Sequence, residues 1–86
     1  MAAFVYILRD LRGKFYTGST ANLERRLRQH QSGSTQTTRN MKSPVLVLSQ
    51  EYPTLVEARR IERRIKKFKR KDYIEKIVKD GFIITR

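Results

Sequence analysis

Within the first 30 residues of the chain, two tyrosines, an arginine and a histidine stand at spacings that suit chemistry on a phosphate group. Tyr6 and Tyr16 lie in two short apolar runs, and Arg26 precedes His30 by one helical turn. An arginine side chain is a permanently charged planar fork that can bind two phosphate oxygens. A tyrosine whose pKa is lowered from about 10 can take a proton from water, and a histidine can orient its hydroxyl. These residue types are suited to the hydrolysis of a phosphodiester bond.

Each of these residues also has a purely structural explanation. Tyr6 and Tyr16 could be a cross-strand aromatic pair that stabilises a hairpin. Arg26 stands in the run Arg25-Arg26-Leu27-Arg28, so it could be one more solvated base. His30 could be a cation near the C-terminus of a helix, where the helix dipole favours positive charge. The residue types alone leave both explanations open.

The charge balance indicates an anionic partner. The chain has 86 residues, with 20 Lys and Arg against 8 Asp and Glu, a net charge of +12 and a pI near 10.8. Solubility requires far less charge, and the excess repels itself in a folded state. Nucleic acid is the first candidate and an anionic membrane surface the second, although an ordinary cationic surface would also explain the composition.

Length and composition exclude several classes of protein. A chain of this length is expected to form one domain over residues 1–86. No apolar run approaches the roughly 18 residues of a membrane span, and no basic region precedes the first apolar run as in a signal peptide. The chain has no Cys and one His, which excludes disulfides, thiolate ligands and a multi-histidine metal site. We therefore expect a cytoplasmic protein with no membrane partner.

The tyrosines need a rigid frame, and the sequence around them predicts a β-hairpin. Residues 4–8 (FVYIL) and 14–18 (KFYTG) are rich in aromatic and β-branched residues, and residues 10–13 (DLRG) supply a turn. Placing Tyr6 opposite Tyr16 leaves a tight loop between the strands, and any even shift of that register keeps both rings on one face.

Arg26 and His30 are predicted on a helix. Asn22 can cap a helix from Leu23 to about residue 32, with Leu23, Leu27 and Ala21 facing the core. Residues 32–43 are rich in Ser and Thr and are expected to form a long loop. Residues 45–52 then supply a third, buried strand.

The rest of the chain predicts two more helices. A capping box of Thr54 and Glu57 begins the longest helix, and a second box of Asp72 and Glu75 begins a short one. The apolar stripe of the long helix consists of Ala58, Ile61, Ile65 and Phe68. Residues 82–84 could form a final strand. The order ββαβα plus a C-terminal helix predicts an α+β fold, a three-stranded antiparallel sheet flanked by helices.

The order of these residues resembles the GIY-YIG nuclease family. Val5-Tyr6-Ile7 and Tyr16-Thr17-Gly18 stand where the two tripeptides of the family name stand, Arg26 follows, and Glu62 lies in the long helix. The resemblance covers residues 4–70. The chain most resembles the small stand-alone GIY-YIG proteins of bacteria. It more distantly resembles the N-terminal domain of the incision subunit of nucleotide-excision repair.

The resemblance implies a role for each of these residues. Tyr6, Tyr16 and Arg26 match catalytic residues, and His30 stands where relatives carry Tyr or His. Glu62 matches the metal-binding glutamate, because it precedes the Arg-Arg-Ile-Lys-Lys segment that follows that residue in relatives. One carboxylate with waters and a substrate phosphate is a common way to hold Mg²⁺. The implied cofactor is therefore one Mg²⁺ or Mn²⁺ ion.

Two positions depart from the family pattern. Ser19 stands where some members carry a Lys that helps to acidify the second tyrosine, and Ile74 stands where some carry an Asn. Glu62 also has an ordinary explanation, as a surface residue in an ion pair with Lys66 one turn on.

Basic residues dominate residues 59–71, where nine of thirteen side chains are Lys or Arg. Backbone phosphates are the natural partner of such a run, although a charge run can also be only a solvated face. The side chains predicted to bind nucleic acid are Arg25, Arg39, Arg63, Arg64, Lys66, Lys67 and Lys71. No base-recognition motif is present, so we expect low sequence specificity, with DNA structure or a partner protein supplying the targeting.

The resemblance implies a metal-dependent endonuclease that hydrolyses DNA phosphodiester bonds in repair or recombination. The alternative is a nucleic-acid-binding module, for DNA or RNA, that kept the fold and lost the activity. Peripheral binding to anionic lipid is a third hypothesis, and it lacks the aromatic-rich amphipathic face of a membrane helix. Of the two tyrosines we expect Tyr16 to be the more important as a base, because it lies nearest Arg26 in the sequence.

Overall fold

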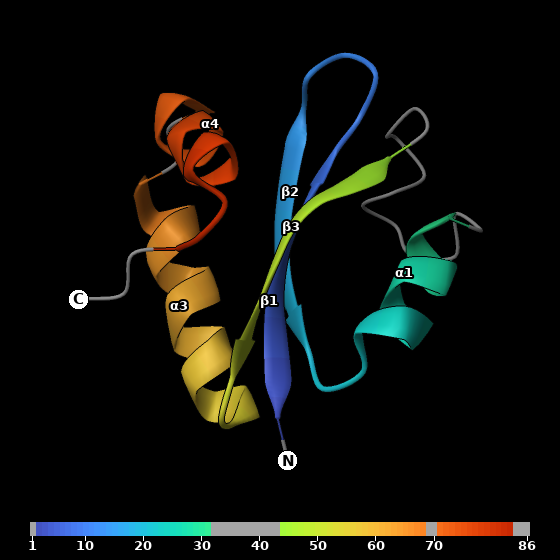
Figure 1. Cartoon of the computed structure of the whole chain (residues 1–86), viewed down its shortest axis with the longest axis vertical. Coiled ribbons are helices and arrows are strands. Elements are labelled where there is room, and N and C mark those ends of the chain that lie inside the picture. The colour runs from blue at the N-terminus through green and yellow to red at the C-terminus, as the bar shows by residue number, and fades with distance from the viewer. Residues whose placement is uncertain (1, 32–43, 69–70, 84–86) are drawn as a thin grey trace.

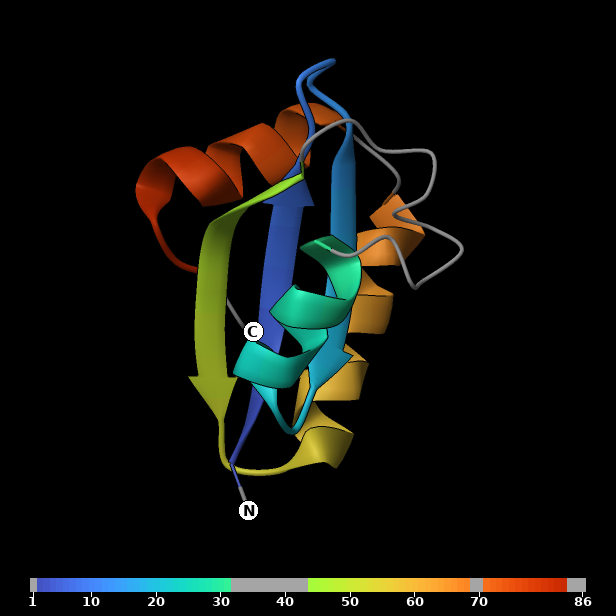
Figure 2. The ribbon, with the colours of Figure 1, turned by 90° about the vertical axis from the view of Figure 1, so that its right-hand side faces the viewer.

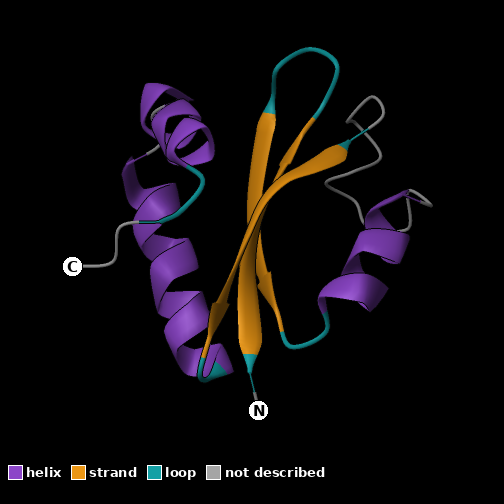
Figure 3. Cartoon of the chain, viewed as in Figure 1, coloured by secondary structure: helices purple, strands orange, loops and turns teal. Residues whose placement is uncertain are grey.

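The computed structural model describes residues 2–31, 44–68 and 71–83, which form one sheet with helices on both faces (Figure 1). In chain order the elements are β1 (Ala3–Arg9), β2 (Phe15–Thr20), α1 (Leu23–Gln31), β3 (Val45–Tyr52), α3 (Leu55–Phe68) and α4 (Lys71–Asp80). The strands all belong to one antiparallel sheet, and the helices cover it (Figure 3). This confirms the predicted α+β fold with a three-stranded sheet.

The central strand of the sheet is β1, which pairs with both neighbours in the order β2-β1-β3 (Figure 2). Its side chains alternate between the two faces. Val5 and Ile7 are fully buried in the core beneath α3, whereas Tyr6 is buried on the opposite face, beneath α1. The hairpin therefore presents Tyr6 to α1.

The register of the hairpin differs from the prediction. Tyr16 lies opposite Leu8, and Tyr6 lies opposite Gly18. The predicted pairing of Tyr6 with Tyr16 is therefore wrong by two residues. A shift of two residues keeps both rings on the same face, as expected from the pleat.

The turn explains this shift. Asp10 Oδ1 accepts hydrogen bonds from the backbone N–H groups of Arg12 (2.9 Å) and Lys14 (2.8 Å). Gly13 has a φ of 80°, a conformation that glycine adopts without strain. These contacts centre the loop on Arg12, one residue beyond Leu11, and each residue of movement at the centre shifts the pairing by two.

The apolar core lies between the sheet and α3. Ala58, Ile61 and Ile65 of the predicted stripe are buried there, and the side chain of Phe68 lies outside the described residues. The Thr54 hydroxyl accepts a hydrogen bond from the backbone N–H three residues on (3.2 Å), which confirms the predicted start of this helix.

Helix α1 covers the other face of the sheet (Figure 1). Asn22 Oδ1 accepts a hydrogen bond from a backbone N–H of the first turn (3.0 Å), so the predicted cap is confirmed. Leu23 and Leu27 are half-buried. Ala21 was expected to face the core and is exposed, because it precedes the helix. The buried residue of α1 is His30.

The end of the described chain does not form the strand predicted over residues 82–84. The backbone of Ile83 is bound by Gln50 of β3, whose Oε1 accepts its N–H (2.6 Å) and whose Nε2 donates to its carbonyl (3.3 Å). This side chain replaces a strand ladder. Ile84, the predicted loop over 32–43 and Arg39 within it lie outside the described residues. No helix in the described part of the chain is long and apolar enough to cross a membrane.

Candidate active site

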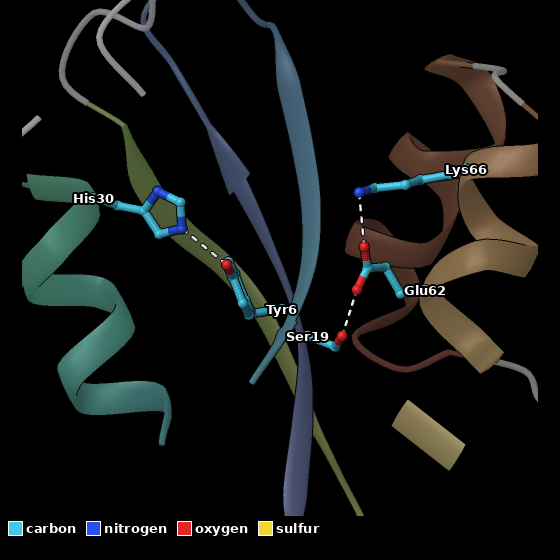
Figure 4. Close-up of polar contacts among 5 residues, drawn as sticks. All are labelled: Tyr6, Ser19, His30, Glu62 and Lys66. Atoms are coloured by element: carbon cyan, nitrogen blue, oxygen red, sulfur yellow. Dashed lines mark hydrogen bonds and ion pairs between the residues drawn. The ribbon is translucent and has the colours of Figure 1, made fainter. Parts of the chain in front are cut away.

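Three predicted catalytic residues meet on the α1 side of the sheet. The ring centroids are 6.2 Å apart for Tyr6 and Tyr16, 5.6 Å for Tyr6 and His30, and 5.3 Å for Tyr16 and His30. The Tyr6 hydroxyl and His30 Nε2 are 2.8 Å apart in a buried hydrogen bond (Figure 4). Tyr6 and His30 are 1% and 3% exposed. Residues from two strands and a helix thus pack into one cluster.

Gly18 makes room for this cluster. A Cβ atom at Gly18 would lie 2.5 Å from the Tyr6 hydroxyl oxygen and 2.6 Å from Cζ of the same ring. The Tyr6 ring therefore lies directly over the backbone of β2 and can do so only above a glycine. This close approach gives a physical reason for the glycine two residues after Tyr16.

Arg26 lies one turn before His30 on α1 and is half-buried. Burial lowers the pKa of His30, and the positive charge of Arg26 lowers it further. His30 is therefore neutral at pH 7. The alternative explanation, a cation placed to favour the helix dipole, is wrong for this residue.

The two active-site tyrosines do not share one environment. Burial raises the pKa of Tyr6 well above 10, Tyr16 raises it further, and Arg26 lowers it only in part. The positive charge of Arg26 therefore does not make Tyr6 more acidic than an ordinary tyrosine, because burial outweighs it in setting the pKa. Tyr6 therefore keeps its proton, and its hydroxyl hydrogen-bonds His30.

Glu62 of α3 is half-buried and bound through both carboxylate oxygens. The Ser19 hydroxyl donates to Oε1, and the Lys66 ammonium lies 2.7 Å from Oε2 (Figure 4). The ion pair with Lys66 is the contact that the ordinary explanation predicts, and the bond from Ser19 adds a contact that orients the carboxylate. Alternation along β2 places Ser19 on the α3 side of the sheet. That alternation is the only feature of the sequence that could have indicated a contact between Ser19 and Glu62.

The two halves of the site meet around β2, which is an edge strand. Tyr16 and Ser19 point to opposite faces of this strand, yet the Lys66 ammonium lies 5.4 Å from the Tyr16 ring centroid. The charge of Glu62 also contributes to raising the pKa of Tyr6. The carboxylate and the tyrosines therefore act on one another electrostatically, across the edge of the sheet.

Glu62 supplies the carboxylate of this site that could bind a metal ion. Within residues 2–31, 44–68 and 71–83, no group of three or more acidic or histidine side chains could hold a metal ion by itself. Mg²⁺ keeps several waters and is often held by one or two carboxylates and a substrate phosphate. Glu62, anchored by Ser19, fits that manner of binding.

The predicted nucleic-acid-binding residues fall on two surfaces. Arg63, Arg64 and Lys67 are exposed on α3, and Lys71 is exposed at the start of α4. Arg25 is exposed on α1, on the opposite side of the sheet (Figure 1). The described members of this set therefore lie on both sides of the sheet.

Comparison with known proteins agrees with this geometry. The family model of the GIY-YIG catalytic domain matches residues 2–76. A UPF0213 protein of Nitratidesulfovibrio vulgaris is 43% identical over 65 residues, which cover 74% of this chain and 59% of that protein. The UPF0213 protein YhbQ of Escherichia coli is 35% identical over 79 residues, covering 91% of this chain and 78% of that protein.

A solved structure has the same fold. The solution NMR structure of the UPF0213 protein BH0048 from Bacillus halodurans is 33% identical, with a TM-score of 0.60 over 94% of this chain and 87% of that chain. GIY-YIG domains are nuclease-type domains that generally act on DNA. The match over most of the chain and the shared fold show that this protein belongs to the GIY-YIG catalytic domain family.

Proposed function

We propose that this chain is a divalent-metal-dependent DNA endonuclease with low intrinsic sequence specificity. The observation that carries the proposal is the buried hydrogen bond between Tyr6 and neutral His30, beside Tyr16 and Arg26. Burying a polar ring costs free energy unless it is hydrogen-bonded, so packing alone would favour an apolar side chain at this position. Membership of a nuclease-type family supports the same conclusion.

In this proposal the chain's own side chains bind the phosphate and move a proton. Arg26 binds non-bridging oxygens of the phosphate and stabilises the charge that develops there. The attacking water gives its proton to the half-buried Tyr16, whose own proton passes through Tyr6 to Nε2 of His30. The water oxygen bonds to phosphorus as the bond to the 3′ oxygen breaks, and the leaving 3′ oxygen takes up a proton from solvent.

Glu62 would hold the Mg²⁺ or Mn²⁺ ion, and Ser19 would keep its carboxylate oriented. When bound, such an ion polarises the phosphate and lowers the pKa of a bound water. Lys66 would have to release a Glu62 oxygen, because its ammonium occupies that oxygen in this structure. Low sequence specificity suits an enzyme that acts on DNA structures in repair or recombination.

One observation favours a second function, a nucleic-acid-binding module without cleavage. Both oxygens of Glu62 already have protein partners, Ser19 and Lys66, and Ser19 replaces the Lys of some relatives. A glutamate whose only role is to hold α3 against β2 would make the same two contacts. DNA or RNA binding by the basic surface of α3 would then be the whole activity.

Cleavage and binding measured side by side test the proposal. Supercoiled plasmid and defined oligonucleotides are incubated with the protein in Mg²⁺, in Mn²⁺ and in EDTA, and binding is measured by fluorescence anisotropy in EDTA. The proposal predicts cleavage that requires metal and is lost in Glu62→Gln, which keeps its binding. Binding without cleavage in either metal would contradict it and support the second function.

A further inference from the structure

A pocket of about 410 Å³ opens beside the active site, between the β1–β2 turn, β2, α3 and α4. Its apolar floor consists of Phe15, Ile65 and Ile74. Tyr16 and Lys66 also line it, so the pocket shares a wall with the active site. Pockets for small organic ligands have volumes of about 300–1,000 Å³, and this space is therefore sufficient for a nucleobase and its sugar.

The rim of the pocket is positively charged. Arg12 and Lys14 of the turn and Lys71 of α4 line it together with Lys66, and none of its described lining residues is acidic. The Lys71 ammonium reaches across to the turn. It lies so close to Gly13 that a Cβ added there would be 3.4 Å from the ammonium nitrogen. An apolar floor inside a ring of cations suits a flat aromatic group that carries phosphates on both sides.

We propose that this pocket binds one unpaired nucleobase of the DNA substrate, next to the phosphate that is cleaved. The inference rests on the proposed function and names its substrate class: DNA with an unpaired nucleotide, as in a single strand, flap or overhang. Tyr16 faces both the pocket and the His30 cluster, so a base in the pocket and a phosphate at Tyr16 would be neighbours on one strand. A paired base would first have to leave its stack, which costs free energy.

The test uses 2-aminopurine, a fluorescent adenine analogue, at the unpaired position of a duplex with a short overhang. Binding is measured in EDTA, so that cleavage plays no part. Stacking of one base on protein rings typically changes affinity by about tenfold. The overhang DNA is therefore expected to bind about tenfold more tightly than a blunt duplex of equal length, with a change in 2-aminopurine fluorescence.

Two variants and two matched controls localise the effect. Ile74→Trp fills the pocket without changing charge, and Val56→Trp places the same ring on an exposed site of α3 outside the pocket. Lys71→Ala removes a cation from the rim, and Lys76→Ala removes one from an exposed site elsewhere on α4. The pocket variants are expected to lose the preference for the overhang, and the controls are expected to keep it.

Thermal unfolding shows whether each variant folds. Ile74 is half-buried, so its replacement could unfold the chain, whereas Lys71 is exposed and its variant keeps the test decisive. Equal wild-type affinity for overhang and blunt DNA, or an unchanged preference in the folded pocket variants, would overturn the inference. Metal-dependent cleavage by a protein that shows no preference for the overhang would overturn the nucleobase pocket and leave the proposed nuclease function standing. A normal 2-aminopurine response in a protein that cleaves nothing would support the pocket and contradict the nuclease.

Discussion

Replacing Lys66 by Met removes the charge that holds one Glu62 oxygen while keeping a side chain of similar length. The Lys66 ammonium lies 2.7 Å from Glu62 Oε2 in this structure. A metal ion that binds Glu62 must break this ion pair, so the pair competes with the metal. Lys66→Met is therefore expected to bind Mg²⁺ more tightly than the wild-type protein.

The size of the effect follows from the strength of the ion pair. Exposed pairs contribute about 0.2–1 kcal/mol. This pair is only partly exposed, with 48% of the Lys66 side chain and 19% of the Glu62 side chain accessible to solvent. Its strength is therefore expected at the upper end of that range, which corresponds to about fivefold tighter metal binding.

The measurement is the dissociation constant of Mg²⁺, taken by isothermal titration calorimetry, together with the Mg²⁺ concentration that gives half-maximal cleavage. Lys67→Met is the matched control, because it removes the same charge from an exposed neighbour that forms no ion pair with Glu62. Equal Mg²⁺ affinity in the two variants, or weaker affinity in Lys66→Met, would refute the competition.

Three further predictions follow from the geometry. Gly18→Ala is expected to lower the free energy of unfolding by about 1–3 kcal/mol and to abolish cleavage, because the added Cβ would displace the Tyr6 ring. A variant whose free energy of unfolding in urea equals that of the wild type would contradict this. The pKa of His30 is expected below 6.5 in an NMR titration of the single histidine. Since the unfolded chain then binds the proton more readily, both stability and cleavage should fall as pH drops below about 6.5; a pKa above 6.5 would exclude the neutral acceptor. Replacing Arg63 and Arg64 together by Gln should flatten the slope of log K against log salt by about 0.9 per phosphate contact on duplex DNA, and an unchanged slope would show that this side of α3 does not contact phosphate.

Local patterns were sufficient to predict the hairpin, the three helices and that the two tyrosines share one face of the sheet. The alternation around Tyr6 and Tyr16 fixes the face, and Asn22 and Thr54 fix two helix starts. The exact register was not predictable from alternation, because it depends on the hydrogen bonds that Asp10 makes within the turn. The strand expected at residues 82–84 is absent from its described part, residues 82 and 83, since the apolar pattern there cannot show that Gln50 binds the backbone of Ile83.

The candidate site was predictable in part. The ion pair of Glu62 with Lys66 follows from helical spacing alone. The bond from Ser19 to Glu62 joins residues 43 positions apart, and it depends on how α3 lies along the edge of β2. The protonation states of Tyr6 and His30 likewise depend on burial, which outweighs the net positive charge of the chain at Tyr6.

In the proposed function, Arg26 and Glu62 serve a metal-dependent cleavage of DNA. Single-turnover cleavage by wild type, Arg26→Ala and Glu62→Gln, with Mg²⁺ present and DNA binding measured separately in EDTA, tests it most directly. Arg26→Ala is expected to cleave about 10²–10³-fold more slowly. Glu62→Gln is expected to lose its response to the metal, while both variants fold and bind DNA. Cleavage at the wild-type rate by either folded variant would contradict the claim.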